Sequence, residues 1–293
     1  MLAMLQPIAL LLIIVAGYLF KRNRLFGPRD YRIVQVALFD LVLPGAIVYS
    51  FAKNPHDISL LWLSAYGFIV ALVPVIIIYL ATSRRPITQR AFLMFIGTGL
   101  NIGCFCFPVV QAFLGNAAVV PAAMFDIGNC VMVAAGTNVM TQTLLHIQPG
   151  RTLAEQHAGD APTLPYSPPT DRDAKRLARR ALAKTIARGF VGSVPFDVYM
   201  LMIVLTVAGW SVPTWLADMF APFANANACV AMLMVGMLMD LPANKRDLFS
   251  VLQVIAWRLP FGIAFGLAAW YLLPFSPMIR EATLMCCLAP IAV

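Results

Sequence analysis

The polar residues best suited to chemistry lie inside apolar stretches of the chain. Asp126 and Asn129 fall in the apolar stretch 118–140, and their spacing places them on one face of a helix. An ionisable side chain inside a membrane is energetically expensive and marks an ion or proton path by default. Asp126 is therefore a candidate carrier of a coupling proton and, with Asn129, a candidate substrate ligand. The alternative is structural, with both side chains supporting a neighbouring segment.

Two further charged residues are each open to two interpretations. Asp40 lies early in the apolar stretch 33–52, and it is either a second proton carrier or a hydrated residue at the membrane interface. Arg258 begins the stretch 258–275, where it either attracts an anion to the mouth of the protein or extends to lipid headgroups.

Glycine and proline interrupt two of the apolar stretches. The first interruption reads GTGLNIGCFCFP, and the second contains Pro290. Both residue types weaken helices, glycine through its flexibility and proline through its missing N–H. When Arg90 is aligned with Arg280, the segment 100–103 matches the segment 290–293. Interrupted helices at corresponding positions predict a binding site near the middle of the membrane, where the free N–H groups of a helix N-terminus suit an anion.

The predicted site consists of these interruptions and the polar face beside them. Asn101 either contacts substrate or caps the second half of its helix. Pro290 either breaks the last predicted span or is an ordinary kink. The candidate substrate-binding residues are Asn101, Gly103, Asp126, Asn129 and Pro290, and the residues at the two interruptions are Leu100, Asn101, Ile102, Gly103, Pro290 and Ile291.

Other chemistry is disfavoured by the sequence. The six cysteines lie in apolar stretches without a C-x-x-C spacing, which favours buried free thiols over a metal site. The chain contains no P-loop, nucleophile elbow or zinc-binding helix motif. We therefore expect no metal, no cofactor and no enzymatic activity.

The elements that position these residues follow from the composition. Of the 293 residues, 61% are hydrophobic and 12% are charged, whereas soluble domains are about 45–50% apolar and about 25% charged. This excludes a soluble enzyme or nucleic-acid binder. The apolar residues form blocks long enough to span a bilayer core of about 30 Å as helices. The predicted spans are 2–20, 33–52, 60–81, 91–113, 118–140, 196–212, 219–240, 258–275 and a last span starting near 282.

The positive charges indicate an orientation. If Arg258 is counted at the interface, every Lys and Arg except Lys53 and Arg280 falls in every second connection between spans. Because basic connections stay in the cytoplasm, we expect the N-terminus outside and the long loop 147–195 inside.

The long loop divides the predicted spans into two sets. The first set, 1–146, holds spans one to five, and the second set, 196–293, holds spans six to nine. An odd number of spans before the loop inverts the second set, as in inverted-repeat transporters. Within the loop, 172–189 is predicted to be a basic amphipathic helix suited to an anionic lipid surface. Because the ninth span is incomplete, we expect the natural chain to continue with its remainder and a tenth.

Several motifs, in their order and spacing, resemble one family of membrane proteins. The quoted segments are AGYLFKRNRLFGPRDYRIVQVALFDLVLPGAIVYSFAKNP, NIGCFCFPVVQAFLG, AAMFDIGNCVMV, GSVPFDVYMLMIVLTVAGWSVP and CVAMLMVGMLMDL. Together they resemble the auxin efflux carrier family, which includes plant auxin carriers and bacterial malonate-type permeases. The departures, such as Leu100 where the plant carriers have proline, favour a bacterial permease.

The resemblance implies an all-α membrane protein with a five-plus-five inverted repeat, in which broken helices four and nine cross. It implies a secondary transporter for a small organic anion that works by an elevator-like movement, and it suggests a dimer. It places Asn101 in the substrate site, makes Pro290 the crossing proline, and makes the residues at the two interruptions those of the crossing. As a bacterial permease, the protein is expected in a bacterial inner membrane. Two other functions stay open: a sodium- or proton-coupled cation or bile-acid-type carrier on a related scaffold, and a membrane sensor that transports nothing.

Overall fold

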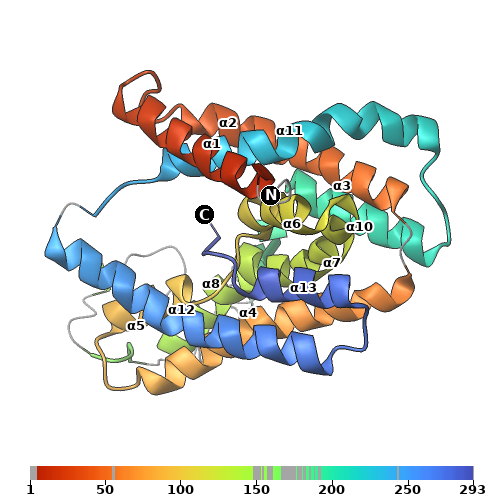
Figure 1. Ribbon diagram of the computed structural model, residues 1–293. Coiled ribbons are helices and arrows are strands. Elements are labelled where there is room, and N and C mark those ends of the chain that lie inside the picture. The colour runs from red at the N-terminus through yellow and green to blue at the C-terminus, as the bar shows by residue number, and fades with distance from the viewer. Residues whose placement is uncertain are drawn as a thin grey trace.

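The computed structural model describes residues 5–54, 57–147, 153, 155–156, 161–165, 176, 180, 183–184, 186–187, 189–190, 193–242 and 244–292. In this part of the chain every regular element is helical, and a single isolated β-bridge joins two extended segments (Figure 1). Much of the predicted amphipathic helix 172–189 lies outside the described residues.

The helices fall into α-helices, three π-helical turns and two short 3₁₀ turns. The first half contains α1 (Leu5–Arg22), α2 (Tyr31–Ala37), η2 (Leu38–Val42), α3 (Leu43–Lys53), η3 (Ile58–Leu60), α4 (Leu61–Ala81), α5 (Ile87–Ile96), η4 (Ile102–Cys106), α6 (Phe107–Leu114), η5 (Asn116–Ala118), α7 (Val119–Val131), η6 (Met132–Gly136) and α8 (Thr137–Leu145). The second half contains α10 (Val194–Val207), α11 (Thr214–Leu238), α12 (Lys245–Leu272) and α13 (Pro277–Cys287). The π-helical turns are η2, η4 and η6.

Six helical stretches among the described residues are long and apolar enough to cross a membrane. They are Leu5–Arg22, Tyr31–Lys53, Ile58–Ala81, Asn116–Leu145, Thr214–Leu238 and Asp247–Leu272. Large apolar side chains on their outer faces are exposed, among them Leu12, Trp62 and Leu267. Helices with apolar outward faces belong in lipid, which confirms the prediction of an all-α membrane protein.

Several predicted span boundaries were wrong by about five residues or more, and two of them lie next to the central segments. The span predicted at 258–275 is part of α12, which begins at Lys245. The hydropathy pattern placed the start of this span too late because it treats Arg258 as a boundary, whereas a membrane helix tolerates an arginine that has hydrogen-bond acceptors. The last span begins at Pro277 rather than near 282, with Ser276 in an extended conformation immediately before it.

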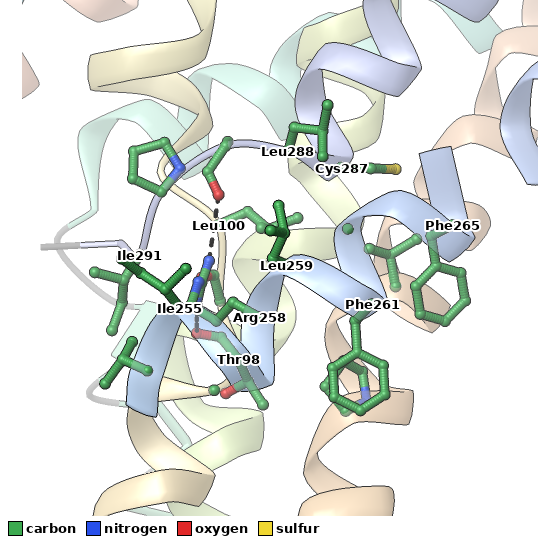
Figure 2. Close-up of a pocket in the computed structure, with 18 residues that line it drawn as sticks. Thr98, Leu100, Ile255, Arg258, Leu259, Phe261, Phe265, Cys287, Leu288 and Ile291 are labelled. Atoms are coloured by element: carbon green, nitrogen blue, oxygen red, sulfur yellow. Dashed lines mark hydrogen bonds between the residues drawn. The ribbon is translucent and has the colours of Figure 1, made fainter. Parts of the chain in front are cut away.

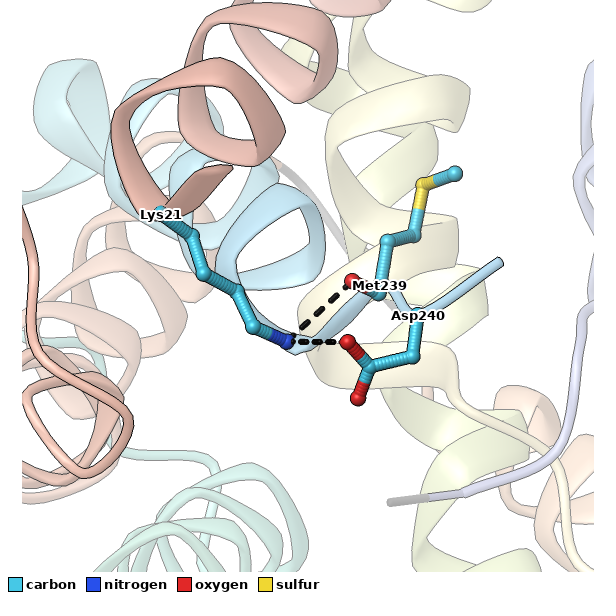
Figure 3. Close-up of polar contacts among 3 residues, drawn as sticks. All are labelled: Lys21, Met239 and Asp240. Atoms are coloured by element: carbon cyan, nitrogen blue, oxygen red, sulfur yellow. Dashed lines mark hydrogen bonds and ion pairs between the residues drawn. The ribbon is translucent and has the colours of Figure 1, made fainter. Parts of the chain in front are cut away.

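One group of helices comprises α1, α2, α3, α10 and α11 (Figure 1). In this group α1 packs along α11, and α11 packs along α3. Lys21 at the end of α1 donates to Asp240, just beyond α11, over 2.7 Å, so α1 and α11 run parallel (Figure 3). At the opposite end of α11, Lys53 contacts Asp218 over 2.6 Å, so α3 runs antiparallel to α11. We call these helices the first group.

The second group comprises α4 to α8, α12 and α13. Within it α4 packs on α7, and α12 packs on α13. The contact between α4 and α7 is close because Gly67 and Gly128 each place bare backbone against the other helix. Small residues at such contacts are typical of helices packed in membranes. Between the two groups lies a core with the fully buried side chains of Phe107, Phe125 and Tyr199.

Candidate functional site

The non-helical segments that follow α5 and α13 lie side by side at the centre of the molecule. After α5 the backbone leaves the helix, passes through Gly99 with a positive φ of 68°, and becomes helical again in η4. After α13 the chain is extended up to the last described residue. Leu100 and Ile291 form an antiparallel bridge, and the Asn101 N–H donates to the Pro290 carbonyl over 2.8 Å. The two extended segments therefore form a minimal piece of β-sheet.

Asn129 completes this pairing from the other edge. Its side-chain oxygen accepts from the Leu100 N–H over 2.9 Å, and its side-chain nitrogen donates to the Leu100 carbonyl over 2.8 Å. A primary amide offers one acceptor and two donors, so it can replace the edge of a neighbouring strand. Because the side chain is 1% exposed, the polar groups of Leu100 are satisfied without water.

Asp126 extends the same network towards the first group of helices. Its Oδ1 accepts from the Asn129 side chain over 2.9 Å, and its Oδ2 accepts from the Tyr199 hydroxyl over 2.9 Å. The carboxyl group is buried, and no cation pairs with it among the residues described here. A hydrogen-bonded chain thus runs from Tyr199 on α10 through Asp126 and Asn129 on α7 to Leu100.

Asn101 and Gly103 shape the start of the second half-helix. The Asn101 side-chain oxygen accepts from the Cys104 N–H over 3.2 Å, which is the bond of a helix N-cap. A Cβ atom on Gly103 would lie 3.0 Å from the Leu43 side chain, so glycine allows this half-helix to approach α3. The structure therefore shows the capping role of Asn101, and its contact with substrate stays a prediction.

A cavity of about 230 Å³ opens beside this network, and we call it the Asp126 cavity. Its lining includes the polar or glycine residues Asn101, Gly103, Asp126, Asn129, Gly189, Ser193 and Tyr199, and Phe39, Leu43 and Val133 are among its apolar residues. The π-helical turns η2, η4 and η6 all contribute to this lining. Such turns occur often at functional sites, because they aim side chains in directions that an α-helix does not.

A second cavity, of about 280 Å³, lies on the other side of the interruptions, and we call it the Arg258 cavity (Figure 2). Its lining includes Thr98, Leu100, Pro290 and Ile291. Arg258 extends from α12 towards the interrupted segments. Arg258 lies in the middle of α12, and its guanidinium donates hydrogen bonds to backbone carbonyls inside the protein. The prediction that it lies at the membrane interface, near headgroups or at the mouth of the protein, was therefore wrong.

The structure divides the predicted site residues between these two cavities. Asn101, Ile102, Gly103, Asp126 and Asn129 line the Asp126 cavity, Pro290 and Ile291 line the Arg258 cavity, and Leu100 lines both. Asp40 is exposed on η2 and lines neither cavity, so the structure does not bring it to the other candidates.

The roles of two residues could not be recognised from the sequence patterns used above. Tyr199 passed unnoticed inside a predicted span, although a tyrosine hydroxyl in an apolar segment needs a partner. Arg258 was noticed, but it was assigned to a membrane interface. The usable signal was that an arginine between long apolar runs must find acceptors inside the protein.

The comparisons with known proteins add no relative. No protein-family model matches the chain, and a search of curated proteins finds none with significant similarity. The class therefore comes from the structure, which is that of an all-α membrane protein whose non-helical segments after α5 and α13 pair at its centre.

Proposed function

We propose that this chain is a secondary transporter that moves a small organic anion across the membrane, and that the Asp126 cavity is its substrate site. The observation that carries the proposal is the position of this cavity at the N-terminal end of a half-helix. The half-helix begins at Ile102, and Ile102, Gly103 and Cys104 line the cavity.

The electrostatics of that position favour a carboxylate. The N–H groups of Ile102 and Cys104 already donate to Leu100 and Asn101, so the attraction for an anion comes mainly from the helix dipole, which places a partial positive charge at this end. A volume of about 230 Å³ is below the range of about 300–1,000 Å³ for drug-sized ligands, so the substrate is small.

The two groups of helices support an elevator-like movement. The first group contributes Phe39, Leu43 and Tyr199 to the lining of the Asp126 cavity, and the second contributes Asn101 and Asp126. A site between two helix groups changes its exposure when one group slides against the other. The paired interruptions after α5 and α13 support the inverted repeat and the crossing of two broken helices that the sequence predicts.

Asp126 gives the proposal a coupling ion. An ionised carboxylate would repel an anionic substrate in the same small cavity, whereas a protonated one would not. Protons therefore enter with the anion, and Asp126 carries them. The hydrogen bonds from Asn129 and Tyr199 hold the carboxyl group in place in both states.

Uptake into proteoliposomes tests the proposal. Purified protein is supplied with labelled monocarboxylates and dicarboxylates, malonate included, with and without an inward proton gradient. We expect one of them to accumulate faster with the gradient than without it. The proposal fails if no carboxylate enters faster than into protein-free liposomes.

The variant Asp126→Asn tests the proton carrier. It keeps the size of the side chain and an oxygen for Asn129, but it cannot ionise. We expect its uptake to be insensitive to the proton gradient. Asp197→Asn, which changes an exposed carboxylate on the same helix as Tyr199, should behave like the wild type. A normal gradient response in Asp126→Asn would refute this role.

A further inference from the structure

The C-terminal ends of two helices meet at the Arg258 cavity. The α-helix α5 ends at Ile96, and α13 ends at Cys287. Carbonyl groups at and beyond such ends have no following turn to supply an N–H, and the helix dipole adds a partial negative charge. Because two such ends meet here, the electrostatic potential is strongly negative at this position inside the membrane-spanning part of the protein.

The guanidinium of Arg258 occupies this point (Figure 2). One terminal nitrogen donates to the carbonyls of Ile96 over 2.9 Å and of Thr98 over 3.1 Å. The other donates to the carbonyls of Gly99 over 3.0 Å and of Ala289 over 3.3 Å. The side chain thus holds the interruption after α5 and the interruption after α13 at once.

These bonds leave the guanidinium little capacity for a substrate. Arginine has five N–H donors, and four of them are used for backbone carbonyls. Within the described residues no carboxylate pairs with Arg258, so its counter-charge is the carbonyl groups themselves. An anion in this cavity would approach four carbonyl oxygens, which disfavours a second anion site.

We propose that the ends of α5 and α13 form a cation site that Arg258 fills permanently with its own side chain. In carriers with broken helices, unwound carbonyls and half-helix C-terminal ends are the usual ligands of a coupling cation. In this chain the guanidinium group of Arg258 occupies the position of that cation. Shortening residue 258 opens the site to a free cation of the same shape and charge, such as guanidinium or methylguanidinium.

Rescue of a shortened variant by methylguanidinium tests the proposal without any transport. Arg258→Ala is purified in detergent, and its Tm is measured with increasing millimolar methylguanidinium chloride. We expect the variant to lose thermal stability and to regain at least half of the lost Tm, while the wild type does not respond. Arg280→Ala, which removes a half-buried arginine bonded to one carbonyl of α12, is the matched control and should not respond either.

Two results would overturn the proposal. One is a folded, monodisperse Arg258→Ala protein whose Tm rises no more than that of Arg280→Ala. The other is an equal rise with tetramethylammonium chloride, because that cation cannot donate hydrogen bonds and its effect would be one of salt alone.

A second pair of variants keeps the proposal testable if Arg258→Ala does not fold. Arg258→Lys retains the charge, whereas Arg258→Met retains an unbranched apolar side chain, shorter than arginine, without the charge. We expect the lysine variant to have the higher Tm, because its ammonium group still satisfies part of the carbonyl set. An equal or higher Tm for the methionine variant would overturn the proposal.

The consequence for coupling rests on the proposed transport function. With the cation place occupied, uptake by the wild type should be equal in sodium chloride and in choline chloride. Uptake that requires sodium would overturn this consequence. If no carboxylate is transported at all, the proposed function fails, while the Tm measurements still decide whether Arg258 fills a cation site.

Discussion

Removing the Asn129 side-chain amide should destabilise the centre of the molecule more than any surface change. In Asn129→Ala the Leu100 N–H loses its partner, the Leu100 carbonyl keeps only the N–H of Ile102 at 3.1 Å, and Asp126 loses one of its donors. The variant keeps the helix itself, since alanine is the best helix former. The effect therefore reports the support of the interrupted segment.

The size of the effect can be bracketed from the three lost bonds. Hydrogen bonds between membrane helices average about 0.6 kcal/mol, which gives a lower value of about 2 kcal/mol. A buried donor left without a partner costs about 1–3 kcal/mol. With the Leu100 N–H as the one orphaned group and the two other lost bonds added, the upper value is about 4 kcal/mol. For a protein of this size, the fall in Tm is then on the order of 5 °C.

The assay is thermal unfolding of the purified protein in detergent, followed by circular dichroism or by thiol-reactive fluorescence. Asn138→Ala is the matched control, because Asn138 is a half-buried asparagine on α8 that bonds only the Gln142 side chain among the described contacts. A fall in Tm for Asn129→Ala no larger than for Asn138→Ala would refute the reasoning, since water or a shifted backbone would then satisfy Leu100 equally well.

Two further predictions concern the backbone and the surface. Gly99→Ala should lower the Tm because a left-handed conformation costs a side-chain-bearing residue about 1–2 kcal/mol and because its Cβ would lie 3.1 Å from Val133. Gly209→Ala has the same φ of 68° with open space around it, so it should lose less, and equal losses would contradict the crowding argument. Lys21→Met should change the Tm by less than about 4 °C, because an exposed ion pair such as Lys21–Asp240 contributes about 0–1 kcal/mol. A fall in Tm larger than about 4 °C would show that this ion pair contributes more than is usual for an exposed pair.

Much of the helical framework could be predicted from the sequence because it depends on local properties. Apolar blocks of sufficient length indicated the membrane helices, and glycine and proline marked the places where α5 and α13 end. The shared face of Asp126 and Asn129 follows from helix geometry alone, and the two side chains are hydrogen-bonded.

The rest depends on contacts between distant parts of the chain. Nothing local to Asn129 says that its amide will pair with Leu100, and nothing local to Tyr199 points to Asp126. The start of α12 was misplaced for the same reason, because the carbonyl groups that accommodate Arg258 come from other segments. Hydropathy treats each residue without its partners, and so it counts a satisfied arginine as a boundary.

The three π-helical turns around the Asp126 cavity give its walls an adjustable fit. Each turn holds one more residue than the α-helical turn it replaces, and this surplus can migrate along the helix by exchanging one hydrogen bond for another. A migration of one position rotates the side chain it passes by about 100° while both ends of the helix stay in place. With such a surplus in η2, η4 and η6, three walls can re-aim their side chains independently. If the cavity is the proposed substrate site, such small slippages within intact helices would let it adapt to anions of different shape without opening the packed contacts between the helices.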